Sequence, residues 1–250
     1  MPYTFQSRLR YSECGEDGLQ SVFSIMNYLQ DCSTFQSESL GLGVARMKEA
    51  GKAWLLSAWH VVIDRYPAFG ETIEIGTFAS GFQGFYGFRK FFIRDAAASF
   101  CVRADSIWFF YDTARGVPER PQSCFSGPYV EAEQETNLDM LQLGPMQRKL
   151  LPPERGAGRQ AEPVTVVRHF LDSNNHMNNA RYLDLASEAA DVWRPRELWA
   201  SYSHEAVLHD VLTPVVETNA RGKLVGLFLP DGRTSAVVAF KEAVPQEAEG

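Results

Sequence analysis

The sequence predicts an α+β chain built from two tandem domains, each with a long helix packed against an antiparallel β-sheet. The main observation is an order of elements that occurs twice: a strand, a polar turn, a long helix and a run of strands. A second is the length of 250 residues with 45% hydrophobic residues, which allows one large domain or two small ones. A third is a stretch rich in Glu, Gln, Pro and Gly between the halves, which predicts a linker. The expected boundaries are 1–128, 129–162 and 163–250.

The first half opens on a predicted strand, Tyr3 to Tyr11, followed by the polar turn SECGEDG. A helix comes next, because apolar residues recur with helical spacing at Leu19, Val22, Phe23 and Met26. Glycine stops helices, so we expect this helix to end near LGLG. A short basic helix, VARMKEAG, then leads into four strands separated by turn residues: 53–64, 71–77, 82–94 and 100–112.

The second half repeats this order more briefly. A strand, EPVTVVRHFL, leads through the turn DSNNHMNN into a helix whose expected apolar face is Tyr182, Leu185, Ala186, Ala189 and Trp193. Four further strands are predicted in LWASYSHEAV, TPVVETNA, KLVGLFLP and TSAVVAFKEA. NLDMLQL, inside the linker, is a candidate for one more helix. Each half is therefore a layered arrangement of one helix on one sheet.

Composition and charge exclude several classes of protein. The net charge of −7 argues against general binding of nucleic acid, which needs clustered Lys and Arg. The longest apolar stretch, AWLLSAWHVVI, is too short to span a bilayer and is interrupted by Ser57 and His60. The start shows no signal or transit segment, so we expect a cytoplasmic protein without a membrane span. The cysteines lack metal-ligand spacing, which predicts reduced thiols and no metal site: Cys14, Cys32, Cys101 and Cys124.

The turn DSNNHMNN holds one acid, four asparagines and a histidine, and two interpretations compete. In the first, Asp and Asn bend the chain, and Asn178 or Asn179 caps the following helix. In the second, Asp172, Asn174 and His176 alternate, so an extended backbone would point all three to one side, at a helix N-terminus. Such a terminus stabilises a developing oxyanion, so the second interpretation predicts acyl chemistry.

A second clue is the stretch SYSHEAVLHD. His204 and His209 are five residues apart rather than four, so they would not share a helix face and we do not predict zinc. On a strand, Glu205 would be a buried acid unless it faced a polar cleft, and such burial is costly. A cleft that contains His176 would remove this cost. The alternative is an edge strand on which Glu205 faces solvent.

Together these stretches resemble the acyl-acyl-carrier-protein thioesterases, a family with two tandem hot-dog domains. In the first half, the resemblance is carried by GLGVARMKEAGKAWLLSAWHVVIDRYPAFGETIEIGTF and ADSIWFFYDTARGVPERP. In the second half, DSNNHMNNARY is similar to the family's Asp-x-Asn-x-His-x-Asn-Asn-x-x-Tyr pattern, and YSHEA is similar to its Tyr-x-x-Glu stretch. The resemblance implies hydrolysis of fatty acyl-acyl-carrier-protein thioesters, which ends fatty acid synthesis.

By this resemblance Asp172, Asn174, His176 and Glu205 take the catalytic positions. Many relatives carry a cysteine directly after the glutamate, whereas this chain has Ala206, so a mechanism with a carboxylate and water remains. Glu205, or alternatively Asp172, would act as general base, and His176 would deliver a proton to the leaving thiolate. Asn174 would orient Asp172, and helix N-terminal amides would hold the thioester oxygen. Direct attack by Asp172 stays open, and neither a metal nor an organic cofactor is required.

The first half lacks this constellation, because SECGEDG has acids but neither His nor Asn. The resemblance places the acyl tunnel there instead. GFQGFYGFRKFF carries aromatic rings on both faces of a predicted strand, which favours burial of both faces, although ordinary core packing explains some of these rings. One face has Phe82, Tyr86, Phe88 and Phe92, and the other has Phe85 and Phe91. We predict that the acyl chain binds at Phe82, Gly84, Tyr86, Gly87 and Phe88.

The resemblance also implies a partner, acyl carrier protein with a phosphopantetheine-linked acyl chain. That partner is acidic, so docking to this acidic chain needs a local basic patch. The candidates are Arg148, Lys149, Arg155 and Arg159 in the linker, and Arg181, Arg194 and Arg196 nearer the site. A homodimer stays open. The rival functions are a coenzyme A thioesterase, a hydroxyacyl dehydratase of the same fold, and a non-catalytic acyl-binding module.

Overall fold

The computed structural model describes residues 1–132, 141, 143–154 and 156–242. The chain divides into two compact units, unit 1 (Met1–Lys149) and unit 2 (Leu150–Gly250), and the division falls inside the segment 129–162. Most of the candidate helix NLDMLQL lies outside the described residues. Within the described part of the chain, no helix is long and apolar enough to cross a membrane.

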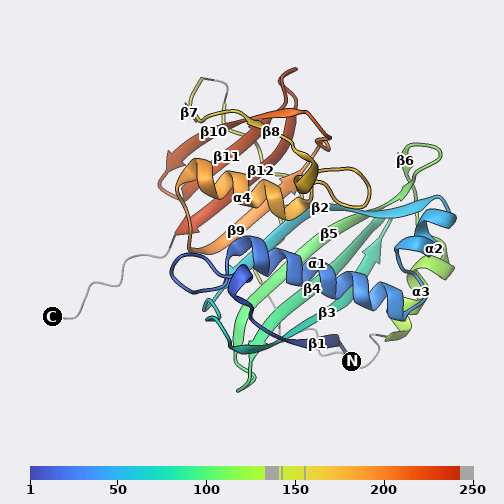
Figure 1. Cartoon of the computed structure of the whole chain (residues 1–250). Coiled ribbons are helices and arrows are strands. Elements are labelled where there is room, and N and C mark those ends of the chain that lie inside the picture. The colour runs from blue at the N-terminus through green and yellow to red at the C-terminus, as the bar shows by residue number, and fades with distance from the viewer. Residues whose placement is uncertain (133–140, 142, 155, 243–250) are drawn as a thin grey trace. The chain divides into compact units, whose positions relative to one another are not determined.

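Unit 1 packs one long helix, α1 (Val22–Ser39), against an antiparallel sheet (Figure 1). The strand order in this unit is β1-β3-β4-β5-β2. α1 buries an apolar stripe that includes Ile25, Met26 and Leu29, each no more than 1% exposed. The remaining elements are β1 (Tyr3–Arg8), the 3-10 helix η1 (Tyr11–Glu13), α2 (Val44–Glu49), β2 (Lys52–Ile63), β3 (Thr72–Gln83), β4 (Tyr86–Asp95), β5 (Phe100–Asp112), β6 (Val117–Pro118) and α3 (Ser123–Ala132).

The strand predicted over 82–94 is wrong in one respect, because the chain turns inside it. Gly84 and Phe85 form the turn between β3 and β4, and Gly84 has a φ of +63°. That left-handed conformation favours glycine and ends the alternation of a strand. Phe82 and Tyr86 consequently lie on different strands, where Phe82 pairs with Gly87.

Aromatic side chains are buried on both faces of the sheet, as the pattern predicts. Phe91 and Phe92 follow one another on β4, so they point to opposite faces, and their exposed fractions are 0% and 3%. Phe92 packs with Phe78 and Leu141 in one buried cluster. Leu141 thus covers part of the second face of the sheet, while α1 covers the first.

Unit 2 repeats the design with a shorter helix, α4 (Asn179–Ala190), against an antiparallel sheet of strand order β9-β12-β11-β10-β7 (Figure 1). α4 buries Tyr182, Leu183, Ala186 and Ala190. Each unit thus has the helix-on-sheet arrangement expected of a hot-dog domain. The other elements are β7 (Arg159–Gln160), β8 (Val164–Thr165), the 3-10 helix η3 (Arg168–Phe170), β9 (Pro195–Tyr202), β10 (Val211–Asn219), β11 (Gly222–Phe228) and β12 (Thr234–Glu242).

Three predictions for unit 2 need correction. The strand EPVTVVRHFL is reduced to the two residues of β8, which pair with β10, and the 3-10 helix η3. Trp193 does not belong to the helix face, because α4 ends at Ala190 and the next residue, Asp191, is a left-handed C-cap with a φ of 52°. Trp193 is 53% exposed. The strand predicted through Glu205 ends at Tyr202, so Glu205 lies in the loop that follows.

The same backbone loop precedes the long helix in both units, which supports the internal repeat. In each unit two isolated bridges close the loop, and an amide of the loop donates to a carbonyl 2.8 Å away. The paired features are the bridges Cys14–Gln20 and Leu171–Met177, the bridges Leu19–Ala68 and His176–Val207, the hydrogen bonds Gln20 N to Pro67 O and Met177 N to Ala206 O, the positive-φ residues Gly18 and Asn175, and the N-caps Ser21 and Asn178. Leu19, predicted to be helical, therefore belongs to this loop and not to α1.

Candidate active site

The turn from Asp172 to His176 is folded back on itself rather than extended. The Asp172 amide donates to the His176 carbonyl at 2.8 Å, and the Asn175 amide donates to the Asp172 carbonyl at 3.1 Å. The Asp172 carboxylate oxygen Oδ1 accepts from the amides of Asn174 at 2.8 Å and His176 at 3.2 Å. Such side-chain bonds to the backbone compete with a strand. The expectation that Asp172, Asn174 and His176 alternate on one extended face is therefore wrong.

The cap interpretation of this turn is confirmed at one residue. Asn178 is the N-cap of α4, and its Oδ1 accepts from the Ala180 amide at 2.8 Å. Capping thus engages a single asparagine. Asn174 is exposed, and in the described residues its link to Asp172 is through the backbone amide rather than the expected side-chain bond.

His176 and Glu205 come together from two segments that are distant in the sequence. His176 Nε2 lies 3.8 Å from Glu205 Oε1, and the two side chains are 37% and 63% exposed. This distance is longer than a hydrogen bond, so the two side chains are neighbours without a direct bond, and both are open to water. Of the alternatives for Glu205, exposure to solvent is observed, but on a loop rather than on an edge strand, so its carboxylate has no desolvation cost.

Unit 2 has an open hollow whose lining includes Glu205. Its lining combines the loop after β9 with the turn between β11 and β12, and its volume is about 580 Å³. His204 lies in this lining, and its Nδ1 is 2.9 Å from the Thr234 carbonyl. A substrate group could therefore approach Glu205 from solvent. The lining residues are Ser203, His204, Glu205, Val207, Asp210, Leu229, Pro230, Asp231 and Arg233.

The equivalent loop of unit 1 carries none of these side chains. By the shared bridges, Gly15, Asp17 and Leu19 take the places of Asp172, Asn174 and His176. Tyr66 takes the place of Glu205, because Pro67 and Ala206 accept the equivalent hydrogen bonds. The two units therefore share one loop geometry, and only unit 2 equips it with an imidazole and a nearby carboxylate.

Unit 1 contains instead a cavity of about 60 Å³ between α1, the sheet and α3. Of the predicted acyl-binding residues, Phe82, Gly87 and Phe88 line it. Gly84 lies in the exposed β3–β4 turn, and the Tyr86 ring is tilted by 42° against Phe85 with a centroid distance of 4.3 Å. Neither residue lines the cavity. The other lining residues are Ser33, Ser37, Trp54, Ala79, Arg89, Trp108 and Tyr129.

Arg89 is a lining residue that the sequence analysis missed. It is 9% exposed, it donates to Gln36 Oε1 and to Thr77 Oγ1 at 3.1 Å, and its guanidinium lies 5.2 Å from the ring centroid of Tyr129. The signal was present, since Arg89 alternates with Gly87 and Phe91 on a strand whose rings are buried. One end of the cavity is thus polar, whereas aromatic rings form much of the remaining wall.

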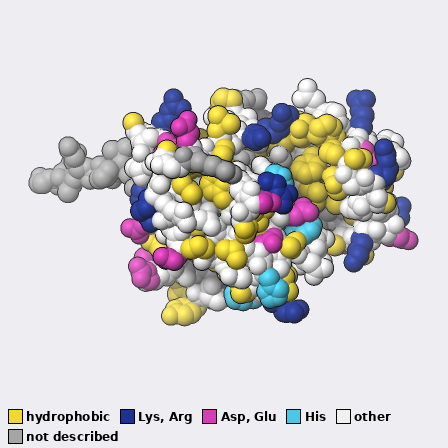
Figure 2. Space-filling view, turned by 90° about the horizontal axis from the view of Figure 1, so that it is seen from above, with side chains coloured by type: hydrophobic (Ala, Val, Ile, Leu, Met, Phe, Trp, Pro, Cys, Tyr) yellow, Lys and Arg dark blue, Asp and Glu magenta, His cyan; other side chains and the backbone are white. Residues whose placement is uncertain are grey.

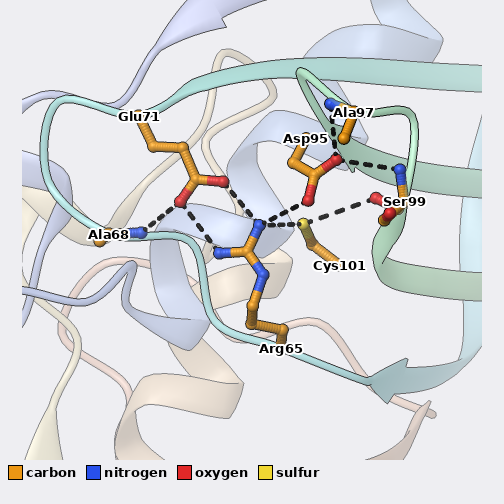
Figure 3. A network of polar contacts seen from close by, with 7 residues as sticks. All are labelled: Arg65, Ala68, Glu71, Asp95, Ala97, Ser99 and Cys101. Carbon is orange, nitrogen blue, oxygen red and sulfur yellow. Dashed lines mark hydrogen bonds and ion pairs between the residues drawn. The ribbon is translucent and has the colours of Figure 1, made fainter.

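One group in the described residues has the composition of a metal site. Glu71, Asp95 and Cys101 bring their ligand atoms within 4.8 Å of one another. Figure 3 shows the Arg65 guanidinium between them: Nη2 lies 2.6 Å from Glu71 Oε1, 3.1 Å from Asp95 Oδ2 and 3.1 Å from Cys101 Sγ. Arg65 occupies the place of a cation, so this network is an ion-pair cluster that ties together two turns of the sheet.

Two of the four thiols are poorly suited to act as nucleophiles. Burial raises the pKa of Cys32 to about 12 and that of Cys101 to about 11. All four cysteines precede residue 125, so none belongs to unit 2, and Ala206 follows Glu205. A thiolate is the reactive form of cysteine, and a raised pKa suppresses it.

Acyl-ACP thioesterases or hydrolases are found among the family models, the protein sequences and the solved structures that are similar to this chain. A family model of the N-terminal domain of acyl-ACP thioesterases matches residues 2–122. A chloroplastic acyl-[acyl-carrier-protein] hydrolase of Cuphea viscosissima is 25% identical over 235 residues, which cover 87% of this chain and 55% of that protein. A chloroplastic palmitoyl-acyl carrier protein thioesterase of Arabidopsis thaliana is 26% identical over 196 residues, with 74% and 46% covered. The chain spans about half the length of these curated relatives.

Two solved structures have the same fold over nearly the whole chain. An acyl-ACP thioesterase from Bacteroides thetaiotaomicron superposes with a TM-score of 0.82 at 18% identity, covering 95% of this chain and 96% of that one. A 12:0-ACP thioesterase from Umbellularia californica gives 0.82 at 19% identity, covering 96% of each chain. The predicted pair of tandem hot-dog domains is thereby confirmed. Residues 2–122 thus match the acyl-ACP thioesterase family model, and the chain as a whole is similar to acyl-ACP hydrolases and shares the fold of acyl-ACP thioesterase structures.

Proposed function

We propose that this protein hydrolyses the thioester of fatty acyl-acyl-carrier-protein and releases a free fatty acid, the step that ends fatty acid synthesis. One observation carries the proposal: two loops share one backbone geometry, and only the loop of unit 2 brings an imidazole next to a carboxylate. An acyl-binding module without catalysis would not need that difference. The match of residues 2–122 to the thioesterase family model supports hydrolysis over dehydration.

In the proposed reaction Glu205 removes a proton from water, and the hydroxide oxygen attacks the thioester carbonyl carbon. The carbonyl oxygen becomes an oxyanion, and we propose that the positive end of the α4 dipole stabilises it, because the Ala180 and Arg181 amides already donate to Asn178. When the carbon–sulfur bond breaks, His176 delivers a proton to the leaving thiolate, and Glu205 then passes the proton that it took from water to the imidazole, which restores both side chains. The separation of 3.8 Å is compatible with this role, because catalytic contacts are often loose without substrate.

We assign Asp172 to the same site in a different role. Its Oδ1 accepts two amides of the turn that carries His176, which favours a part in holding that turn over direct attack on the substrate. Asn174, at the exposed corner of the turn, is available to the substrate or its carrier. The alternative, an anhydride formed by Asp172, would require this carboxylate to leave its amide partners.

We further propose that unit 1 binds the acyl chain in its cavity, at Phe82, Gly87 and Phe88. These residues belong to the wall that aromatic rings dominate, which suits a hydrocarbon. Gly84 and Tyr86, although predicted with them, do not reach this cavity.

The proposed partner is acyl carrier protein with its phosphopantetheine arm, in preference to coenzyme A. Several of the predicted basic residues have local contacts: Arg159 donates to the Ala189 carbonyl, Arg181 pairs with Asp184, and Arg148 lies over Tyr86. Arg155 lies outside the described residues. Figure 2 shows basic side chains scattered over the face it presents rather than gathered in one patch. Docking of the acidic carrier protein would then use individual basic residues that are separated on the surface.

The test is a panel of acyl-acyl-carrier-protein and acyl-coenzyme A esters of matched chain lengths, with release of free thiol as the readout. We expect hydrolysis of both, with higher kcat/KM for the carrier-protein esters. No thiol release from any ester would refute the function, and a preference for coenzyme A esters would refute the partner. The finer expectations of a cytoplasmic location and a homodimer are tested by cell fractionation and by light scattering.

A further inference from the structure

The short segment that carries Glu205 is held by hydrogen bonds at the peptide groups on both of its sides. The Ala206 amide donates to the Tyr182 hydroxyl oxygen at 2.9 Å. On the other side, the Ser235 hydroxyl donates to the His204 carbonyl at 2.6 Å. The two side chains come from α4 and β12, so elements outside the loop determine where this part of the loop lies.

These two hydroxyls form one buried unit. Their oxygens are 3.4 Å apart, and the exposed fractions of Tyr182 and Ser235 are 3% and 1%. A hydroxyl donates one proton and also accepts. The Ser235 hydroxyl has one proton, so its short bond to the His204 carbonyl leaves a weaker contact with the Tyr182 hydroxyl oxygen. Ala206 is itself 0% exposed, so water does not readily replace the clamp.

The Glu205 side chain depends on this backbone support. Its carboxylate is largely exposed and lies 3.8 Å from His176 Nε2, too far for a hydrogen bond to fix it. Tyr182 belongs to the helix that begins directly after the His176 turn. The Tyr182 hydroxyl on this helix therefore adds to the direct hydrogen bond from the Met177 amide to the Ala206 carbonyl in setting the position of the Glu205 loop relative to His176.

The internal repeat offers an independent comparison. In unit 1 the residue equivalent to Tyr182 is Ile25, which is 0% exposed and has no hydroxyl, and the residue equivalent to Glu205 is Tyr66. An apolar side chain thus fills this helix position in the loop without the acid. The hydroxyl occurs in the unit where a carboxylate must be positioned.

From these contacts we propose that Tyr182 and Ser235 are positioning residues, which act through the Ala206 and His204 peptide groups to hold Glu205 beside His176. This inference rests on the proposed function, in which Glu205 is the general base. Neither hydroxyl takes part in the chemistry. Their removal lets the loop move, and small displacements of a catalytic group are costly to the rate of the chemical step.

The test is a double-mutant cycle of Tyr182→Phe and Glu205→Gln. For each variant, steady-state kcat and KM are measured on one acyl-acyl-carrier-protein ester. We expect Tyr182→Phe alone to lower kcat by roughly tenfold to a hundredfold with little change in KM. In the Glu205→Gln background the same substitution should have almost no further effect, because its target is already absent. Ser235→Ala should show the same dependence and serves as the second variant if Tyr182→Phe does not fold.

Tyr202→Phe is the matched control. Tyr202 packs edge-on against Tyr182 at 5.5 Å and donates to the Asn179 carbonyl at 3.1 Å, so it loses a hydroxyl in the same region without touching the Glu205 loop. We expect it to keep kcat. Equal loss of kcat in Tyr202→Phe, or full additivity in the cycle, would show a general structural effect and overturn the inference.

The cycle also separates the two levels of the proposal. If Glu205→Gln lowers kcat and both hydroxyl variants keep it, the positioning inference fails and the proposed general base stands. If Glu205→Gln keeps wild-type kcat, the proposed base is wrong and the inference falls with it.

Discussion

Gly87 offers a direct test of whether the cavity of unit 1 binds the acyl chain. A Cβ added at Gly87 would lie 3.0 Å and 3.2 Å from atoms of the Trp54 ring and 3.3 Å from Phe82. Both rings line the cavity, so the side chain of Gly87→Val would enter it after the rings move by a few tenths of an ångström. The cavity measures about 60 Å³, and even a small side chain takes up a substantial part of it.

The magnitude follows from the apolar burial that the substrate loses. Each methylene kept out of an apolar site forfeits roughly 0.8 kcal/mol, which is about fourfold in kcat/KM. If Val excludes about two methylenes, the longest good substrate should lose about fifteenfold, while chains that end before Gly87 lose little. The product profile should therefore shift to shorter acids.

The assay compares kcat/KM over a ladder of saturated acyl-acyl-carrier-protein esters for the wild type and for Gly87→Val. The control is Gly84→Asn, because Gly84 lies three residues away in an open turn, with nothing within 4 Å of an added Cβ. Asparagine tolerates the left-handed φ of this position better than other residues do. We expect the control to leave the profile unchanged.

Two results would refute this reasoning. An equal fall for all chain lengths in a folded Gly87→Val protein would show that the cavity does not measure the chain. A shift caused by Gly84→Asn alone would place the acyl chain along the β3–β4 turn. Far-UV circular dichroism and a urea melt of each variant establish that the comparison is made on folded protein.

The remaining predictions concern the active site, the thiols and the ion-pair cluster. Glu205→Gln and His176→Ala should each lower kcat by about a hundredfold to ten-thousandfold, and near wild-type turnover of both would refute the site. Asp172→Asn should lower kcat less, because an amide oxygen can still accept hydrogen bonds from the two turn amides. Replacing all four cysteines with Ala or Ser should leave kcat intact, and a loss of kcat in the folded variant would support a thiol mechanism. The hydrogen bond from Arg65 lowers the pKa of Glu71, so this pair stabilises the folded state above the unfolded-state pKa and loses that effect as the pH falls through the lower folded-state pKa. Arg65→Met should therefore weaken the acid dependence of the free energy of unfolding between about pH 5 and about pH 3, as measured by urea melts, and an unchanged dependence would show that the pair contributes nothing.

Local patterns in the sequence were sufficient for the architecture. The repeated order of elements predicts two like domains, and helical spacing at Val22 and Met26 predicts a buried helix face that the structure confirms. The turn DSNNHMNN also predicts a helix N-terminus, where Asn178 caps α4. These features depend on residues close together in the chain, and their spacing is visible in one dimension.

The tertiary structure alone decided how the site is assembled. The Asp172 turn folds back because its carboxylate binds two local amides, and Glu205 leaves the strand for a loop, so neither follows the alternation that a strand would impose. The contact of His176 with Glu205 and the support from Tyr182 depend on which loops meet at the N-terminal end of α4. Hydrogen bonds between distant segments depend on sheet register and helix placement. The spacing of residues along the chain reports local structure and does not reveal which distant segments will meet.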